Sequence, residues 1–306
     1  MRLKPGRPDI SSYTDRFDVP PARDEFGVTF LGVSSLLFQD GESAVLTDGF
    51  FSRPSLLKVG LRKIGPDVTR IDTALARVGI DRLDAVVPVH THYDHAMDAA
   101  VVAQRTGAIL VGGESAANVG RGHGLHDDQI KVVTPSEPLT FGAFRLTWIE
   151  SEHCPPDRFP GHITEPVVPP AKANAYRCGE AWSILAEHAS GRTALIQGSA
   201  GFVSGKLTGR RADVAYLGVG QLGAQSEDYM RTYWTETVDT VGARRVVLIH
   251  WDDFFRPLDL PLRALPYAGD DLDATMRVFT ELAARQDVAL HFPTVWQRED
   301  PWHSRE

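Results

Sequence analysis

The chain has few cysteines and no long apolar run. Cys154 and Cys178 are the two cysteines among 306 residues, too few for the disulfide framework of a small secreted domain. No segment approaches the roughly 20 consecutive apolar residues of a membrane-spanning helix. No apolar stretch typical of a signal peptide follows the basic residues at the N-terminus. These absences lead us to expect a cytoplasmic protein without a membrane partner.

The chain also lacks concentrated positive charge. Its formal net charge is −8, and no basic run is longer than the pairs Arg210-Arg211 and Arg244-Arg245. A nucleic-acid surface requires a basic stripe, so we expect no nucleic-acid partner. The expected partner is a small-molecule substrate, and an N-terminal extension over residues 1–25 is compatible with a homo-oligomer.

A dense cluster of metal-ligand side chains stands out against these absences. Residues 90–95 read His-Thr-His-Tyr-Asp-His and directly follow the apolar run 85–89. A strand that ends in this cluster places its ligands at one edge of a sheet, and imidazole with carboxylate suits zinc, iron or manganese. Four ionisable side chains this close would repel and desolvate one another without a cation. The segment therefore predicts a metal site.

The pattern His-x-His-x-Asp-His after a buried strand resembles the signature of the metallo-β-lactamase superfamily. Further motifs occur in a similar order, namely opening hairpins at 27–32 and 44–49, His153, a strand and turn at 194–201, and His250 after the strand 246–249. The resemblance covers roughly residues 26–293. The segments around residues 48–51 and 250–254 look most like the branch of ascorbate-6-phosphate lactonase-like proteins.

The resemblance implies two adjacent metal sites. The ligands of the first ion would be His90, His92 and His153. The ligands of the second would be Asp94, His95 and His250. Three neutral nitrogens with an open fourth position are the arrangement of a hydrolytic zinc. The implied cofactor is therefore zinc, as one or two ions, with manganese or iron as alternatives.

One position departs from the superfamily pattern. Where the superfamily has Gly-Asp, with an aspartate that bridges both ions, this chain has Gly198-Ser199, and no Asp or Glu lies between Glu187 and Asp213. The hydroxyl of Ser199 could hydrogen-bond a bridging water or leave room for substrate. Ser199 is therefore a catalytic candidate beside Asp94, which could orient the attacking water or accept its proton. We expect weaker binding of the second ion.

Hydrophobic periodicity and turn signals place the elements along the chain. Strands are expected at 26–32, 34–39, 43–48, 84–89, 109–111, 130–133, 138–141, 143–149, 181–187, 193–197, 213–217, 244–249 and 287–292. Helices are expected at 67–78, 95–105, 226–241 and 271–286. A strand-rich half followed by an α/β half suits an α+β fold, the four-layer αββα sandwich of the resembled superfamily.

The expected organisation is the N-terminal extension followed by a single domain over residues 26–306. The extension would wrap the domain or contact a partner subunit. Residues 155–173 contain six prolines. Because proline cannot supply a central strand, we predict an ordered loop or lid directly after His153.

Several residues near the motifs have two interpretations. Asp48 resembles the superfamily's acid behind the ligand loop, or it caps a turn. Asp252 or Asp253 could orient an imidazole N–H. Cys154 adjoins an implied ligand, and His162 could reach the mouth of the site. The aromatic residues that flank the ligand-bearing strand ends, expected to divide between pocket and core, are Phe50, Phe51, Trp251, Phe254 and Phe255.

The leading functional hypothesis is a metal-dependent hydrolase that uses metal-activated water on a small ester, lactone, amide or phosphoester. A non-haem iron oxidoreductase is the first alternative, although the missing bridging aspartate counts against it. A non-catalytic metabolite-binding protein on the same fold is the second. The shape of the pocket, and hence the substrate, depends on the loops 50–66, 112–128 and 155–173. No sequence motif predicts the conformation of these loops.

Overall fold

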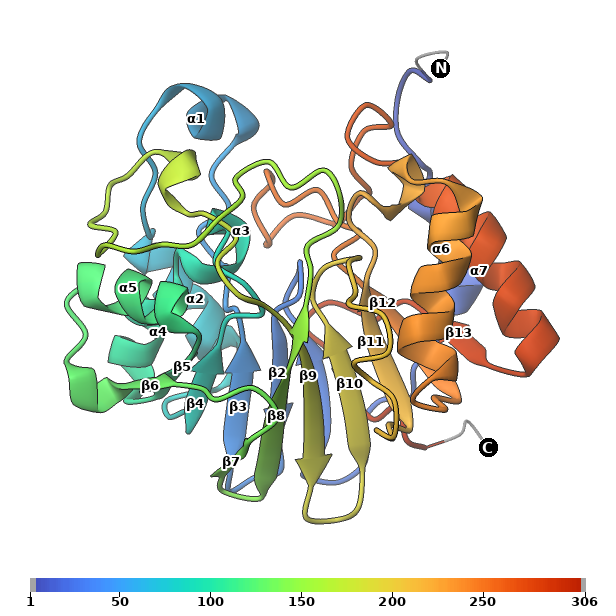
Figure 1. The fold of residues 1–306 in the computed structure, drawn as a ribbon, viewed down its shortest axis with the longest axis horizontal. Helices are drawn as coiled ribbons and strands as arrows, with labels where there is room; N and C mark the ends of the chain where they lie inside the picture. The colour runs from blue at the N-terminus through green and yellow to red at the C-terminus, as the bar shows by residue number, and fades with distance from the viewer. Residues whose placement is uncertain (1–3, 304–306) are drawn as a thin grey trace.

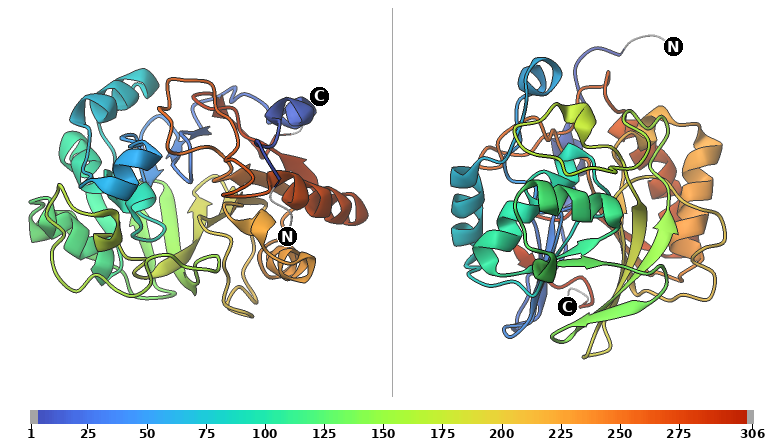
Figure 2. Two further views of the ribbon diagram at one scale, coloured as in Figure 1. Left: turned by 90° about the horizontal axis from the view of Figure 1, so that it is seen from above. Right: turned by 60° about the vertical axis from the view of Figure 1, so that its left-hand side comes forward.

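Two β-sheets pack face to face, with helices on both outer sides (Figure 1). The structure is a computed structural model that describes residues 4–303. Viewed from above, the helices of the first half and of the second half lie on opposite sides of the sheet pair (Figure 2). The predicted four-layer αββα sandwich is confirmed. Within residues 4–303, no helix has both the length and the apolar character needed to cross a membrane.

The first sheet has seven strands in the order β14-β1-β2-β3-β4-β5-β6. Their bounds are β1 Gly27–Phe30, β2 Leu36–Gln39, β3 Ala44–Thr47, β4 Ala85–Val87, β5 Ile109–Gly112, β6 Ile130–Val132 and β14 Arg298–Glu299. Neighbours are antiparallel from β14 to β3 and parallel from β3 to β6. The helices in this half of the chain are α1 Leu56–Leu61, α2 Val68–Val78, α3 Tyr93–Ala96, α4 Ala99–Thr106 and α5 Glu114–Gly122.

The second sheet has seven strands in the order β13-β12-β11-β10-β9-β8-β7. Their bounds are β7 Pro138–Phe141, β8 Phe144–Ser151, β9 Ala181–His188, β10 Thr193–Gln197, β11 Val214–Gly218, β12 Arg245–Ile249 and β13 Ala289–His291. Neighbours are antiparallel from β7 to β10 and parallel from β10 to β13. The helices α6 Glu227–Trp234 and α7 Leu272–Gln286 lie on its outer side (Figure 1).

Short helical turns complete the fold. Four are 3₁₀ turns, at Ile10–Arg16, Asp127–Gln129, Ala173–Ala175 and Leu222–Ala224, and a π turn at Thr235–Asp239 continues α6. The predicted helix over 226–241 is therefore α6 followed by this π turn. Ser226 and Asp271 cap α6 and α7 by accepting backbone hydrogen bonds, and Gly79 ends α2 in the left-handed region (φ 68°).

Three apolar layers hold the sandwich together. Between the sheets, inward side chains such as Phe30, Trp148 and Ile184 are almost completely buried. A second layer joins the first sheet to α2 and α4, and a third joins the second sheet to α6 and α7. Strands buried on both faces read as continuous apolar runs, which is why their ends were readily located in the sequence.

The N-terminal segment lies along the sandwich. Tyr13 and Phe17 pack against the core cluster that contains α7 residues. The Phe17 ring stacks on Phe292 at 5.3 Å between centroids, and the Tyr13 ring lies 5.9 Å from Phe292. Pro21 pairs with Glu299 of β14. This segment therefore wraps the domain in the structure.

The elements missing from the sequence prediction are α1, α5 and β14. Three of the six residues of α1 are strongly exposed leucines, so it has no amphipathic pattern, and β14 has only two residues. Helix α5 contains poor helix formers, but Gly122 is required there because a Cβ would lie 2.1 Å from the Val167 carbonyl oxygen.

The predicted helix over 95–105 is divided into α3 and α4 at Asp98. The Asp98 carboxylate accepts hydrogen bonds from the backbone N–H groups of Phe51 (2.8 Å) and Ser52 (2.6 Å) and from the Ser52 hydroxyl (2.7 Å). This buried residue therefore fixes the segment after β3 against the helix that follows the histidine motif.

We predict that Asp98 makes stability depend on pH. Burial raises the pKa of Asp98 to about 6 from 3.8, although the bonds from Ser52 and Phe51 oppose this. The folded protein then binds this proton more tightly than the unfolded chain, so the contribution is complete below the unfolded pKa and is lost as pH rises through about 6. The unfolding free energy of the wild type minus that of Asp98→Asn should fall by roughly 2–3 kcal/mol between about pH 4 and pH 7. A difference that denaturant titrations find constant over this interval contradicts the prediction.

Candidate metal centre

Three strand ends meet at one edge of the sandwich and bring the six predicted ligands together. The residues that follow β4 carry four of them, β8 is followed by His153, and β12 is followed by His250. The six side chains form two groups, namely His90 with His92 and His153, and Asp94 with His95 and His250. In each group the candidate ligand atoms all lie within 4.8 Å of one another.

The first group consists of three imidazoles. Nε2 of His90 lies 3.2 Å from Nδ1 of His92. The ring of His153 lies 5.0 and 4.7 Å from theirs, centroid to centroid. Nδ1 of His153 lies 2.7 Å from the carbonyl oxygen of Cys154, which leaves Nε2 as its free ligand nitrogen. Burial and the neighbouring imidazoles lower the pKa of His90 well below its usual value and that of His153 to about 4. Their nitrogens are therefore neutral near pH 7, as metal binding requires.

The second group combines a carboxylate with two imidazoles. Oδ2 of Asp94 lies 3.6 Å from Nε2 of His95 and 3.5 Å from Nε2 of His250. Burial alone would raise the pKa of Asp94, but the imidazoles of His95 and His250 outweigh it and hold the pKa below its usual range. Nε2 of His95 is buried and has no hydrogen-bond partner among the described residues.

These observations fit a divalent metal ion in each group. A buried polar atom without a partner costs free energy, and an ion between the three ligand atoms would satisfy it. Ligand atoms at about 2.0–2.2 Å from an ion lie about 3–4 Å from one another, close to the separations found here. The rings of His90 and His95 are 3.9 Å apart, so the two groups are adjacent. Asp94 is the sole carboxylate among the six side chains.

Asp48 contacts both a candidate ligand and the strand end before the histidine motif. Its Oδ2 lies 2.9 Å from Nδ1 of His95 and accepts a hydrogen bond from Ser34, while its Oδ1 accepts the Val89 N–H at 2.9 Å. The residue is fully buried and has a left-handed backbone (φ 52°). Asp48 thus turns Nε2 of His95 toward the second group and also fixes the strand end before the histidine motif.

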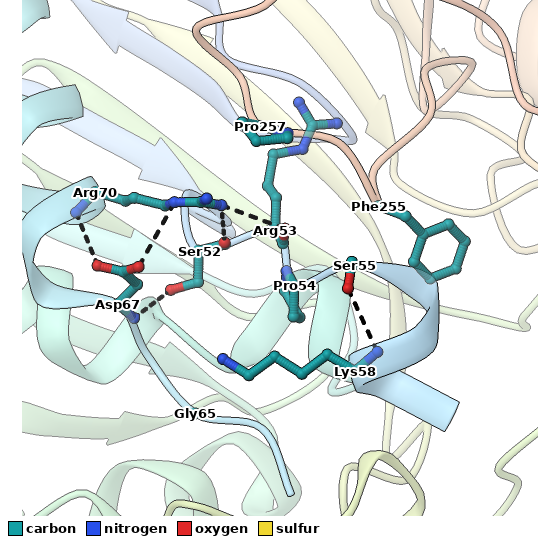
Figure 3. Close-up of a pocket in the computed structure, with 10 residues that line it drawn as sticks. All are labelled: Ser52, Arg53, Pro54, Ser55, Lys58, Gly65, Asp67, Arg70, Phe255 and Pro257. Carbon is teal, nitrogen blue, oxygen red and sulfur yellow. Dashed lines mark hydrogen bonds and ion pairs between the residues drawn. The ribbon is translucent and has the colours of Figure 1, made fainter. Parts of the chain in front are cut away.

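A fully buried ion pair supports His250. Arg53, in the segment after β3, donates to Oδ2 of Asp252, and Oδ1 of Asp252 accepts the Val33 N–H at 2.8 Å. The Val33 carbonyl in turn accepts the N–H of His250 at 2.6 Å. Arg70 of α2 donates to the carbonyls of Ser52 and Arg53 and so holds the base of Arg53 (Figure 3).

The backbone around this ion pair is strained. Val33, Arg53 and His250 have φ values of 53°, 41° and 57°, in a region that non-glycine residues seldom occupy. We expected Asp252 or Asp253 to orient an imidazole, but neither carboxylate forms a hydrogen bond with a histidine ring in the described residues. Asp252 acts on His250 through the backbone of Val33, and Asp253 pairs with Arg7 and Arg263.

Asp157 is a residue of the site that the sequence analysis missed. Its Oδ1 lies 3.1 Å from Nε2 of His92, on the side of the ring opposite Nδ1. Burial would raise the pKa of Asp157, but His92 outweighs it and lowers the pKa. The buried thiol of Cys178 completes this small cluster, and its pKa is raised by burial and by Asp157. The sequence signal was only a carboxylate four residues after His153 in the Pro-rich loop.

Ser199 lies beside the first group but outside both ligand sets. Its hydroxyl accepts the backbone N–H of Cys154 at 2.9 Å, and its carbonyl accepts from Gln197. Ser199 thus fixes the backbone next to His153. Cys154 is itself fully buried in the core, where burial raises the pKa of its thiol to about 12.

One cavity of about 980 Å³ opens onto both groups. Its lining includes His92 and His153 of the first group and Asp94 and His250 of the second. Phe254 and Phe255 also line it, while Phe50, Phe51 and Trp251 are buried in the core, so the five aromatic residues divide as expected. His162 does not line the cavity; its side chain is largely exposed and lies near Glu180.

Comparisons with known proteins find one family model and several solved structures that are similar to this chain. The model of the family described as the Metallo-beta-lactamase superfamily matches residues 28–170. Igni18, a metallo hydrolase from Ignicoccus hospitalis KIN4/I, has a similar structure, with a TM-score of 0.50, 13% identity, and coverage of 90% of this chain and 96% of that chain. CmlA, a diiron β-hydroxylase from Streptomyces venezuelae, has a TM-score of 0.54 and 12% identity over 91% of this chain and 54% of that chain.

None of the curated proteins matches the chain. At identities this low, the similar structures speak for the fold alone. The family model therefore matches a little under half of the chain, and the similar structures show that the chain shares their fold.

We predict that Asp157 strengthens binding at the first group by orienting His92. Asp157→Ala should lower the zinc affinity of that group by about 10–100-fold, and Asp157→Asn, which retains a neutral acceptor, should lower it less. Competition with a chromophoric chelator measures both. Glu165→Gln, an exposed carboxylate of the same loop, is the control. Equal affinities for all three variants and the wild type would falsify the role.

We also predict that the Arg53–Asp252 pair is essential for stability. Arg53→Met leaves Asp252 buried without its partner and should lower the unfolding free energy of the metal-free protein by about 3–5 kcal/mol. Arg53→Met with Asp252→Asn should lose less. The control is Arg105→Met, which breaks an exposed pair with Asp72 (3.0 Å) and should cost below about 1 kcal/mol. Chemical denaturation gives the four values, and equal losses for Arg53→Met and Arg105→Met contradict the prediction.

Proposed function

We propose that this protein is a metal-dependent hydrolase of a small molecule. The observation that carries the proposal is the pair of adjacent, buried ligand groups at the base of one large cavity. Imidazoles and one carboxylate, with a cavity wide enough for a substrate, are typical of hydrolytic metal sites. The substrate is an ester, lactone, amide or phosphoester.

In this proposal His90, His92 and His153 hold a first ion, and Asp94, His95 and His250 hold a second. A bound ion would lower the pKa of a coordinated water towards about 7 and would polarise the oxygen of the scissile group. Zinc is the proposed metal, with manganese or iron as alternatives, and the second ion is the more weakly held. The lactonase-like branch remains the proposed relationship within the superfamily.

Hydrolysis adds water across the scissile bond. The water oxygen bonds to the acyl carbon or phosphorus, the bond to the leaving group breaks, and one water proton passes to the leaving atom. Asp94 lines the cavity and is held ionised by its imidazole neighbours, so it can orient the water and accept that proton. We propose that Ser199 acts indirectly, by fixing the backbone next to His153.

A test must distinguish hydrolysis from iron-dependent oxidation, because a diiron β-hydroxylase has a similar fold. The superfamily pattern contains a bridging aspartate that this chain replaces with Ser199. We therefore favour hydrolysis, and we propose a cytoplasmic enzyme whose partner is its small-molecule substrate.

We predict that Asp94→Asn lowers kcat/KM at least about 100-fold on any substrate that the wild type hydrolyses. The panel contains 4-nitrophenyl acetate, a γ-lactone, a β-lactam and bis(4-nitrophenyl) phosphate, assayed with zinc, manganese or iron after removal of metal by a chelator. His162→Asn, whose side chain lies outside the cavity, should retain full activity. Metal per chain is measured for each variant by elemental analysis. A fully loaded wild type that hydrolyses nothing, or a coloured iron protein that consumes oxygen, argues against the hydrolase.

A further inference from the structure

Helix α1 exposes apolar side chains at the rim of the cavity. Leu56, Leu57 and Leu61 are 62%, 72% and 69% exposed. The helix stands at the outer end of the molecule, above the edge where the ligand-bearing strands end (Figure 1). Water solvates such side chains at a cost in free energy, so adjacent exposed leucines beside a site indicate a binding surface.

Two of these leucines belong to the cavity, and the third does not. Leu56 and Leu57 line the same space as His92, Asp94 and His250, whereas Leu61 lies outside its lining. Other apolar side chains continue this wall, namely Val59, Phe159, Phe254, Phe255 and Leu265. The cavity thus combines the ligand residues with apolar side chains that include the exposed leucines, and its lining also holds charged side chains such as Arg158, Lys172 and Arg263.

The wall is anchored at both ends of α1. Ser55 caps the first turn by accepting the Lys58 N–H. Beyond the helix, Ile64 exchanges two backbone hydrogen bonds with Ala171 of the Pro-rich loop, at 2.7 and 2.9 Å. A Cβ on Gly65 would lie 3.3 Å from Pro169, so the two segments also pack closely. These contacts fix the position of the surface, and a fixed surface lowers the entropic cost of binding.

We infer that the cavity takes a substrate with an unbranched apolar chain, which lies along α1 against Leu56 and Leu57 while the scissile group reaches the ligand end. This inference rests on the proposed hydrolase for the scissile group, but the chain site itself does not require catalysis. The apolar side chains of the lining, which reach out to Leu56 and Leu57, can accommodate a chain of variable length. The chain then covers leucines that are otherwise exposed.

A lipid surface is the competing occupant, because α1 and its neighbours also carry Lys58, Arg62 and Lys63. An anionic bilayer would contact all three exposed leucines together. A single chain within the cavity would contact Leu56 and Leu57 but not Leu61. The three leucines therefore separate the two occupants.

The first measurement is binding to the metal-free protein. The fluorescent probe is 11-(dansylamino)undecanoic acid, and dansylglycine, which has the same dye and carboxylate without the chain, is the matched probe. We expect the wild type to bind the undecanoate at least about tenfold more tightly. Leu56→Ser with Leu57→Ser should abolish most of this difference, and Leu61→Ser should preserve it. Thermal unfolding checks that the variants fold.

The second measurement is kcat/KM of the zinc-loaded protein for 4-nitrophenyl esters with acyl chains of increasing length, below their micelle-forming concentrations. We expect a rise of about two- to fourfold per methylene in the wild type and in Leu61→Ser, and a much flatter series in the double variant.

Each outcome decides between the hypotheses. Chain-dependent probe binding without hydrolysis of any ester supports the chain site and overturns the hydrolase. Hydrolysis without chain dependence, with equal binding of both probes, overturns the chain site and leaves the hydrolase intact. Equal loss of probe binding in Leu61→Ser and in the double variant overturns the chain site in favour of a lipid surface.

Discussion

The buried ion pair between Arg53 and Asp252 is the interaction on which the candidate site depends. Arg53 belongs to the segment after a strand of the first sheet, and Asp252 follows a strand of the second. Both side chains are completely shielded from water, so neither charge is tolerable without the other. Through Asp252 and Val33, the pair fixes the strained backbone at His250. The ion pair thereby holds the segments that follow strands of the two sheets in one arrangement around His250.

Three of the other candidate ligands, His92, His95 and His153, each face an oxygen atom with the ring nitrogen that points away from the ligand group. Asp48 faces Nδ1 of His95, Asp157 faces Nε2 of His92, and the carbonyl of Cys154 faces Nδ1 of His153. These acceptors come from different segments: the turn after β3, the Pro-rich loop and the end of β8. Metal-ligating histidines usually have such partners, which fix the tautomer and the ring orientation. The arrangement is therefore preorganised for metal ions.

The elements that the sequence predicted well are those whose local pattern is strong. Buried strands such as β4 and β12 are short apolar runs that end at histidines, and α2 and α7 have clear amphipathic spacing and capping residues. The failures have physical causes. Helix α1 exposes its leucines, α5 contains glycines required by close packing, and the helix after the histidine motif is interrupted because Asp98 binds the backbone at residues 51 and 52. None of these tertiary contacts leaves a periodic signal.

The sequence by itself indicated most strands and the histidine motif, because apolar runs and ligand spacing are local properties. Its resemblance to the superfamily implied the layered fold and the six candidate ligands in two groups. Only the tertiary structure decided which residues face the ligand rings from behind and what lines the cavity. Asp157 faces His92 only because the Pro-rich loop folds back over the ligand edge, and Leu56 reaches the cavity only because α1 is tied to that loop at Ala171. Contacts between residues so far apart in the chain follow from packing, which no short sequence pattern encodes.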